Sequence, residues 1–445
     1  MLAAASGSRT LNGHGLYDEE FRKMLAVRYV MAGERSLELL QGLIIYCAWY
    51  PVHLRPKDKR VSQYIRIAVD IVSDLELDNA ADGPLPSPQS SGLDKLRTLL
   101  ATYLLVSTHA ISRNQATTLP FSSWISKCCD TLSQQHSLSQ DKALVSLVRM
   151  QHIIEQPPVT PAETEICLRQ VEADMGPEIT SMPSTDTALL FTRIVTLASP
   201  LLTTFQRKPS SRATACSPLL TAAQLASCIP FARAFFAAIL ALPRAHLTCF
   251  SSLDWARFVL CVVLCFRLSF PLTHCPEWDV DAARRELRFE QLLAQMCELG
   301  GREGKERNAD AAGGFEGNPP NVVAAMQVML RLVKRKFDAK IEAEKVGAAT
   351  EAPAARATSG CPMINGSAEQ WLMLWDEEGA GTGAAFSSDL READSVMSGP
   401  RGREASYSVW GTATPPVYHD LWATMTMHWG PGGGRELGAR GLDSE

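Results

Sequence analysis

Apolar residues recur at helical spacing along the chain from about residue 18 to residue 299. The clearest stripe predicts an amphipathic helix over residues 61–77, because its apolar positions step by three and four while polar side chains take the opposite face. Its members are Val61, Tyr64, Ile65, Ala68, Ile71, Val72 and Leu75. Comparable patterns predict helices over residues 37–50, from Ser91 onward, and over 139–157, 160–176, 186–206, 218–242, 252–270 and 279–299.

Helix-boundary residues support these assignments. Ser36 is typical of an N-cap, and Thr160 with Pro161 and Glu163 supplies N-cap, N1 and N3 signals. Gly176 followed by Pro177 is expected to stop the helix that begins there. No run alternates with a period of two between hairpin turns, so the sequence predicts an all-α, multi-helix domain with non-bundle packing.

Composition divides the chain into five parts. Residues 1–17 are expected to be disordered, and residues 18–299 form the all-α body. Residues 300–320 are polar and rich in Gly, which is typical of a linker, and residues 321–346 form a further amphipathic helix. Residues 347–445 are rich in Gly, Ala, Ser and Pro, which predicts a disordered tail with short aromatic and acidic islands.

Charge and hydropathy narrow the function classes. The 445 residues are 46% hydrophobic and carry a net charge of −5, whereas a protein that holds nucleic acid across its surface is normally basic. The apolar stretch Phe258–Phe266 is nine residues long, too short to cross a bilayer, and predicts a buried core helix. No signal-peptide pattern opens the sequence, so we expect an intracellular protein with reduced thiols and no membrane segment.

Twelve cysteines raise the question of a metal site. Structural zinc sites present paired thiolates at short spacing, and the only close pairs are Cys128 with Cys129 and Cys261 with Cys265. The second pair lies on a strongly apolar helix, where cysteine packs as a small hydrophobe. His274 and Cys275 follow nine to ten residues later and leave a metal site open as the alternative, but we expect neither metal nor cofactor in this chain.

Catalytic motifs are absent from the sequence. It contains no nucleophile elbow, no phosphate-binding loop and no metalloprotease helix motif, and we predict that the chain is not an enzyme. The histidines are scattered without pairing, and for His53, His109 and His152 we expect structural or surface roles.

A short basic run lies on the predicted helix over 321–346. It comprises Arg331, Lys334, Arg335 and Lys336. One interpretation is a solvated helix face, and the other is a weak nuclear-import or phosphate-contacting patch.

An aromatic and acidic island lies within the predicted tail. Its members are Trp371, Leu374, Trp375, Asp376, Glu377 and Glu378. Acidic residues keep exposed aromatic side chains solvated, as in activation segments that fold on a partner. A short helix that docks on the helical body stays open as the alternative, because two exposed tryptophans are costly in water.

One stretch carries a recognisable pattern. Leu39–Leu43 (LLQGL), Ala48-Trp49-Tyr50 and Asp74-Leu75 lie in a segment that resembles the helical middle region of fungal zinc-binuclear-cluster transcription factors. Residues 96–132 and 254–279 continue the similarity, which covers roughly residues 18–300. The resemblance implies an all-α regulatory domain in a nuclear protein that controls genes transcribed by RNA polymerase II, in metabolic or secondary-metabolite pathways.

The same resemblance implies protein partners and a small-molecule effector. Family members carry six clustered cysteines before this region, but the first cysteine here is Cys47, so the family's zinc ligands and DNA-contacting residues transfer to no position. We therefore expect the chain alone to bind any DNA duplex weakly and without sequence preference. Either the DNA-binding module lies in a longer product or a dimer partner, or the chain is an interaction or decoy protein; an α-helical enzyme with an unrecognised site is the third alternative.

Overall fold

The computed structural model describes residues 11–50, 60–78, 90–113, 116–134, 138–157, 160–203, 221–272, 275–298 and 322–346. The chain divides into two compact units, Met1–Gly381 and Thr382–Glu445, and all of the described residues belong to the first. Within them the ordered elements are helices, and the only β-type pairing is an isolated bridge between Leu272 and Cys275. The predicted all-α, non-bundle fold class is confirmed.

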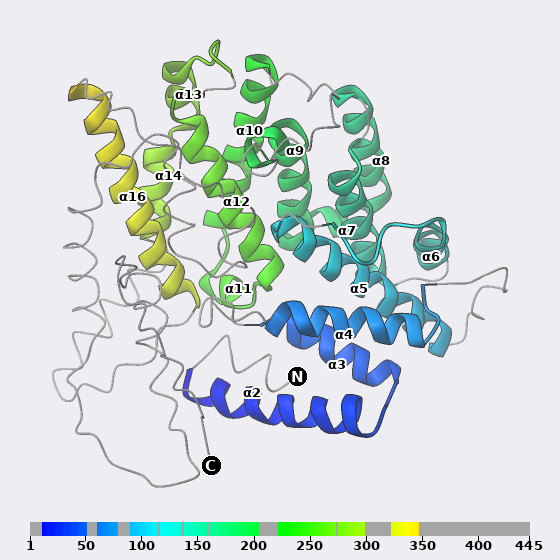
Figure 1. The fold of residues 1–445 in the computed structure, drawn as a ribbon. Helices are drawn as coiled ribbons and strands as arrows, with labels where there is room; N and C mark the ends of the chain where they lie inside the picture. Colours follow the sequence, from blue (N-terminus) through cyan, green and yellow to red (C-terminus); the bar gives the residue numbers. More distant parts are fainter. Residues whose placement is uncertain are drawn as a thin grey trace, which may run out of the picture. The chain divides into compact units, whose positions relative to one another are not determined.

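The helices follow one another in three groups (Figure 1). The first group is α2 (Leu11–Leu25), the π-helical η1 (Ala26–Met31), α3 (Leu37–Ala48), α4 (Arg60–Asp74) and α5 (Ser90–Arg113). The second is α6 (Ser123–Gln134), α7 (Ser139–Glu155), α8 (Pro161–Thr180), α9 (Pro183–Thr203) and α10 (Ala222–Leu240). The third is α11 (Arg244–Thr248), α12 (Ser252–Leu268), α13 (Val280–Leu287), α14 (Phe289–Cys297) and α16 (Val322–Val346).

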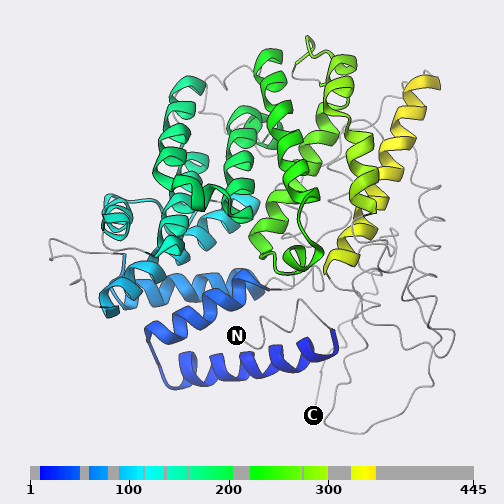
Figure 2. The same cartoon turned by 180° about the vertical axis from the view of Figure 1, so that it is seen from behind.

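Helix α12 is the centre of the packing. It contacts α3, α5, α9, α10 and α13, and every residue from Trp255 to Leu268 except Leu260 is buried. This all-round burial matches the apolar stretch Phe258–Phe266, as expected for a core helix. Seen from behind, α7, α8, α9 and α10 run side by side next to it, consistent with their mutual contacts (Figure 2).

The N-terminal helix α2 corrects one prediction. Residues 1–17 were expected to be disordered, yet α2 begins at Leu11. The helix is fixed by its C-terminal half, where the buried Asp18 carboxylate accepts a hydrogen bond from Tyr46 and Phe21 stacks on the Tyr46 ring at 3.8 Å. Packing of this kind extends a helix beyond its intrinsic propensity.

The sequence predicts one helix over residues 279–299, but the structure has two helices there, α13 and α14. Arg288 adopts a left-handed conformation with φ of 49° and separates α13 from α14. Neither Gly nor Pro marks this break, so the sequence carries no local signal for it. The change of direction lets Phe289 and Leu293 of α14 become buried, and α14 packs on α16.

Other boundaries agree with the sequence. The Ser36 side chain accepts a hydrogen bond from the Leu39 amide at 3.2 Å, and Thr160 forms a capping box with Glu163. Gly176 leaves the helical region with φ of 71°, so the expected stop is a kink within α8.

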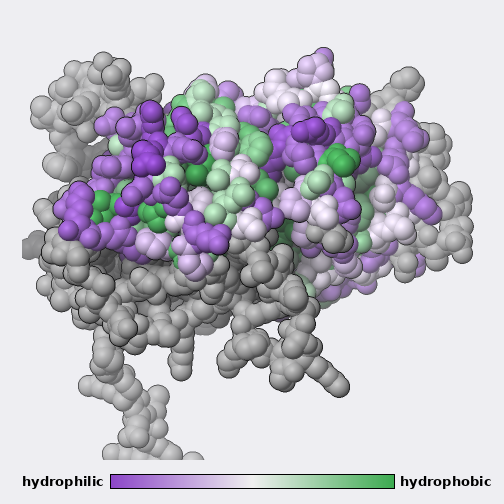
Figure 3. Space-filling model, turned by 90° about the horizontal axis from the view of Figure 1, so that it is seen from above, coloured by the Kyte–Doolittle hydropathy of each residue, from purple (hydrophilic) through white to green (hydrophobic). Residues whose placement is uncertain are grey.

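Helix α10 is long and apolar enough to cross a membrane by length and composition. Its buried face packs on α9 and α12. Pro230 lies within α10 and is exposed, so its ring faces away from this core. On the face of the molecule drawn in Figure 3, hydrophilic residues are intermixed with hydrophobic ones.

Candidate functional site: a cavity beside Arg257

A small cavity of about 10 Å³, roughly the room that one water molecule needs, lies where four helices meet. It is lined by Thr108, Ile111 and Ser112 of α5, Gln151 and Ile154 of α7, Phe191 of α9, and Ala256, Arg257 and Leu260 of α12. The volume is far below the roughly 300–1,000 Å³ that is usual for the pockets of drug-sized ligands. The cavity therefore has room for about one water molecule.

Local sequence fixes the position of Arg257. Ser251 caps α12, and the Asp254 carboxylate accepts a hydrogen bond from the Ser251 amide at 3.0 Å. Arg257 follows Asp254 by three residues and therefore lies on the same side of the helix, one turn deeper in the core. The capping box thus fixes the position of the Asp254 carboxylate, which faces Arg257.

The charge of Arg257 is only partly compensated. Its side chain is 7% exposed, and Nη1 donates to Asp254 Oδ1 at 3.3 Å, longer than the 2.7–2.9 Å of a strong charge-assisted bond. This is the one hydrogen bond of Arg257 within the described residues. Burial lowers the pKa of Arg257, and the nearby Asp254 carboxylate opposes that shift. The guanidinium remains a cation and keeps free donors.

Thr108 presents a second unsatisfied group. Three hydroxyls on the same helix donate to the carbonyl four residues earlier: Thr98 to Asp94 at 2.6 Å, Thr102 to Thr98 at 2.7 Å, and Ser112 to Thr108 at 2.7 Å. The Thr108 hydroxyl is buried and has no hydrogen-bond partner. A buried polar group of this kind is uncommon, because leaving it unpaired costs about 1–3 kcal/mol.

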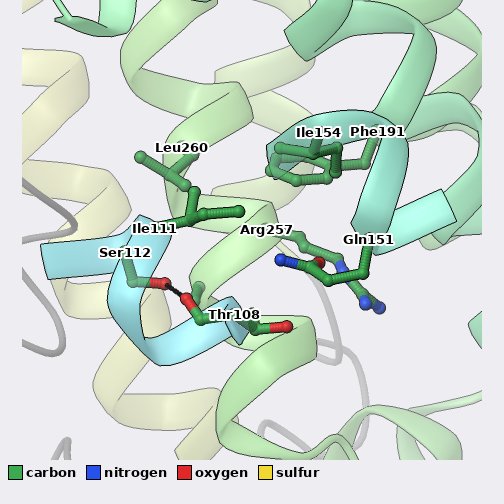
Figure 4. A pocket seen from close by; sticks show the side chains of 9 residues that line it. Thr108, Ile111, Ser112, Gln151, Ile154, Phe191, Arg257 and Leu260 are labelled. Atoms are coloured by element: carbon green, nitrogen blue, oxygen red, sulfur yellow. Dashed lines mark hydrogen bonds between the residues drawn. The ribbon is translucent and has the colours of Figure 1, made fainter. Parts of the chain in front are cut away.

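The surface of the cavity is almost entirely apolar, although four polar side chains belong to its lining. Figure 4 shows Gln151 and Arg257 together on one side, with Ile111 and Leu260 on the other side and the Thr108 side chain below. Gln151 is held in place because its Nε2 donates to Ser107 Oγ at 2.9 Å. The lining brings no pair of catalytic groups into contact.

The structure places the residues of the predicted basic run in different environments. Arg331 and Arg335 are exposed on α16, and Lys334 pairs with Asp338 at 2.6 Å. Lys336 is buried, so it does not share the polar face on which the sequence placed it. The reason is helical geometry: Lys336 is next to Phe337 and on the side that packs inward with Leu332 and Val333. The remaining three residues keep their import role as a prediction.

The aromatic and acidic segment and the candidate zinc ligands are the two other groups of residues that the sequence singles out. The segment with Trp371, Leu374, Trp375, Asp376, Glu377 and Glu378 lies outside the described residues, as does His274. Cys261, Cys265 and Cys275 are buried, and burial raises the pKa of the Cys261 and Cys265 thiols. Within the described ranges no three metal-binding side chains come together. The expectation of a chain without zinc stays a prediction.

The described histidines have structural surroundings. His109 lies between α5 and α4, with Nε2 3.2 Å from Ser62 Oγ. His152 stacks on Phe121 at 3.8 Å, and burial lowers its pKa. His53 lies outside the described residues.

Sequence reasoning missed the cavity. Its polar groups are separated by up to 149 positions, from Thr108 to Arg257, and no local spacing joins them. One signal was available: Arg257 stands inside a mostly apolar helix, where a buried charged residue needs either a partner or a function.

Comparison with known proteins places the chain near fungal regulators. It is 23% identical over 275 residues to the transcription factor himD of Aspergillus japonicus, which covers 56% of this chain and 46% of himD. It is 23% identical over 404 residues to the transcription factor opdL of Penicillium oxalicum, covering 82% of this chain and 69% of opdL. The chain is thus distantly similar to fungal transcription factors.

The match to himD covers only part of that protein. The chain spans about half of the length of himD. No protein-family model matches it, and no solved structure matches it. The similarity to transcription factors favours a non-enzymatic regulator and agrees with the all-α fold.

Proposed function

We propose that this chain is a transcription regulator of fungal type whose helical domain is its regulatory part. It acts in the nucleus on RNA polymerase II genes of a metabolic or secondary-metabolite pathway, and it performs no catalysis. The observation that carries this proposal is the similarity to opdL across 82% of the chain.

The regulator reaches DNA through another module. Among the described residues, the exposed cations Arg331 and Arg335 stand beside the Lys334–Asp338 ion pair. Sequence-specific DNA binding requires positioned contacts to phosphates and bases. A DNA-binding dimer partner, or a zinc cluster in a longer product, supplies these contacts, and the transcription machinery is the second partner.

Promoter occupancy tests the proposal directly. The epitope-tagged chain is expressed at its natural level in the fungal host, and chromatin immunoprecipitation is combined with transcript profiling of a deletion strain. We expect occupied promoters whose transcripts change on deletion. Unchanged transcripts together with no promoter occupancy would contradict the proposal, and occupancy without transcript change would favour the decoy alternative.

The aromatic and acidic segment serves as the activation region in this proposal. Residues 366–430 fused to a heterologous DNA-binding domain are expected to activate a reporter, and replacement of Trp371, Leu374 and Trp375 with Ala is expected to abolish that activation. Trp429→Ala is the matched control, because Trp429 has no acidic neighbours in the sequence. Equal activity of the triple and control variants would remove this role from the segment.

Nuclear import depends on the exposed members of the basic run. We expect Arg331→Ala, Lys334→Ala and Arg335→Ala together to lower nuclear fluorescence of the tagged chain, whereas Lys336 is left unchanged because it is buried. The control replaces Arg285, Lys142 and Lys345, which are exposed cations outside the run. An identical distribution of both triple variants would show that the run is only a solvated helix face.

A further inference from the structure

Exposed apolar side chains are concentrated on the N-terminal helices α2 and η1. Eight large hydrophobic side chains are exposed among the described residues, and five of them lie within residues 17–31. A surface helix normally turns polar side chains outward, so a group of exposed apolar ones on one helix marks an interaction surface. We call this surface the outer face, and its members are Tyr17, Met24, Val27, Val30 and Met31.

The other side of the same helix holds it to the body. Asp18 and Leu25 are buried, and the Phe21 ring stacks on the Tyr46 ring. Figure 1 shows α2 at the lower edge of the described helices, next to α3. The body therefore fixes one side of the helix, whereas on the outer face Val30 and Met31 are 71% and 80% exposed.

The backbone of η1 is unusual in a way that packing within the chain does not explain. Residues 26–31 are π-helical, and the Ala32 amide donates to the Val27 carbonyl, five residues earlier, at 2.9 Å. None of the residues from Ala26 to Met31 is buried. Short π segments are rare and occur frequently at functional sites. Methionine adapts its shape to a partner and is common on binding surfaces, which favours the same interpretation of the outer face.

The residues along the helix are arranged symmetrically about Met24. Tyr17 and Met31 lie seven residues on either side of Met24, and the acidic Glu20 and the basic Arg28 lie four residues on either side. We propose that the outer face binds the outer face of a second copy of this chain, with the two helices antiparallel and Met24 at the two-fold axis. Tyr17 of each copy then meets Met31 of the other, and Glu20 meets Arg28, as a two-fold interface requires.

Charge complementarity selects this occupant and this orientation. A parallel pair in the same register would place Glu20 on Glu20 and Arg28 on Arg28, and like charges in contact oppose association. Glu20 is 61% exposed and pairs with Lys23 at 3.0 Å, and Arg28 is 42% exposed and pairs with Glu34. Exposed ion pairs contribute little to stability, so sharing these side chains with a second copy costs little.

The inference concerns assembly of the chain with itself and does not require the proposed role in transcription. The contact is one helix wide on each copy, so the dimer is weak, with a Kd on the order of 10 µM. Sedimentation equilibrium of the purified full chain between roughly 1 and 200 µM measures it. We expect a reversible monomer–dimer equilibrium in this range.

Charge substitutions assign the dimer to the outer face. Met24→Lys brings two ammonium groups together at the two-fold axis and should weaken dimerisation by about tenfold or more. The matched control is Ile166→Lys, because Ile166 is an apolar side chain on α8 that is 67% exposed, and this variant should dimerise as the wild type does. Both positions are on the surface, so far-UV circular dichroism should show unchanged helix content. Val27→Lys is the second variant if Met24→Lys does not fold.

Disulfide trapping tests the antiparallel arrangement. Met24→Cys should form a crosslinked dimer with itself on mild oxidation. Tyr17→Cys and Met31→Cys should each fail to crosslink alone, whereas a mixture of the two variants should give a crosslinked dimer. The background replaces with Ser the two exposed cysteines of the described residues and the two cysteines that lie outside them, namely Cys167, Cys249, Cys216 and Cys361.

Three contrary outcomes would overturn the proposal. A chain that stays monomeric over the whole concentration range would leave the outer face to another partner. A dimer that Met24→Lys and Ile166→Lys leave equally intact would use a different surface. Crosslinking of Tyr17→Cys with itself would show a parallel pair. Promoter occupancy is measured separately, so failure of this inference and failure of the proposed function are distinguishable.

Discussion

The two ends of α12 carry the same buried residue type in opposite circumstances. Arg257 and Arg267 are both less than a tenth exposed and stand ten residues apart on one helix. Arg267 donates from Nη1 to the carbonyl of Leu201, near the end of α9. Arg257 has a single long contact to Asp254 and borders a cavity.

The groups around each arginine differ in the same way. Near Arg267 the carbonyls at the end of α12 are used: Trp278 Nε1 donates to Leu268 at 2.9 Å, and Arg284 Nε donates to Ser269 at 2.7 Å. Near Arg257 the Thr108 hydroxyl, which lines the same cavity, is buried without a partner. Native proteins pair nearly all buried polar groups, so the Arg257 end of α12 is less completely hydrogen-bonded than the Arg267 end.

Substitutions of core side chains should give the largest difference in the free energy of unfolding between the two ends of α12. Phe266 is fully buried and lies within 5.0 Å of the Phe270 ring and 5.7 Å of the Phe337 ring, measured between centroids. Phe266→Ala should lower the free energy of unfolding by about 3–5 kcal/mol. Leu260→Ala should cost about 2 kcal/mol or less, because Leu260 is half-buried and already borders empty volume.

Urea denaturation of both variants measures these values. A Leu260→Ala loss that equals the Phe266→Ala loss would show that the two ends are packed alike. The m-value should stay constant, since neither substitution changes the surface exposed on unfolding by much.

Replacement of each arginine by Met is the second comparison. Arg267→Met leaves the Leu201 carbonyl without that donor and should cost about 1–3 kcal/mol. Arg257→Met removes a buried cation whose desolvation exceeds the gain from one long ion pair, and Asp254 keeps its capping hydrogen bonds to Ser251. The variant should be within about 1 kcal/mol of the wild type, or more stable.

The sign of the change in the free energy of unfolding of Arg257→Met shows whether Arg257 stabilises the fold. Chemical denaturation at neutral pH gives both values on the same scale. A loss at Arg257 as large as that at Arg267 would mean that Arg257 is a structural residue with a full set of partners.

Much of the fold follows from the sequence because short-range rules govern it. The apolar residues from Val61 to Val72 whose spacing predicts one helix face are buried together. Ser36 and Thr160 cap the helices that the sequence predicts them to cap. Helix α6 was not predicted, although Ile125, Cys128, Cys129 and Leu132 have helical spacing and are all buried. The spacing of these four residues by three and four positions indicates a helix from the sequence alone.

Other features could not be read from local sequence. The start of α2 depends on Asp18 and Phe21 meeting Tyr46, and the break at Arg288 depends on α14 packing against α16. The cavity depends on α5, α7, α9 and α12 converging at one point. These are consequences of tertiary packing, which overrides local propensity and has no fixed spacing along the chain.

The smallest expected effect tests the hydroxyls of α5 as a matched pair. Thr108→Val removes a buried hydroxyl with no partner, so it should leave stability unchanged or raise it by up to about 1 kcal/mol. Thr102→Val removes a donor to the Thr98 carbonyl and should cost about 0.5–1.5 kcal/mol. Both substitutions exchange one β-branched residue for another on the same helix, so helix propensity cancels in the comparison. Thermal and urea unfolding give the two differences. If Thr108→Val cost as much as Thr102→Val, ordered water would satisfy Thr108, and the Arg257 end of α12 would be as fully hydrogen-bonded as the Arg267 end.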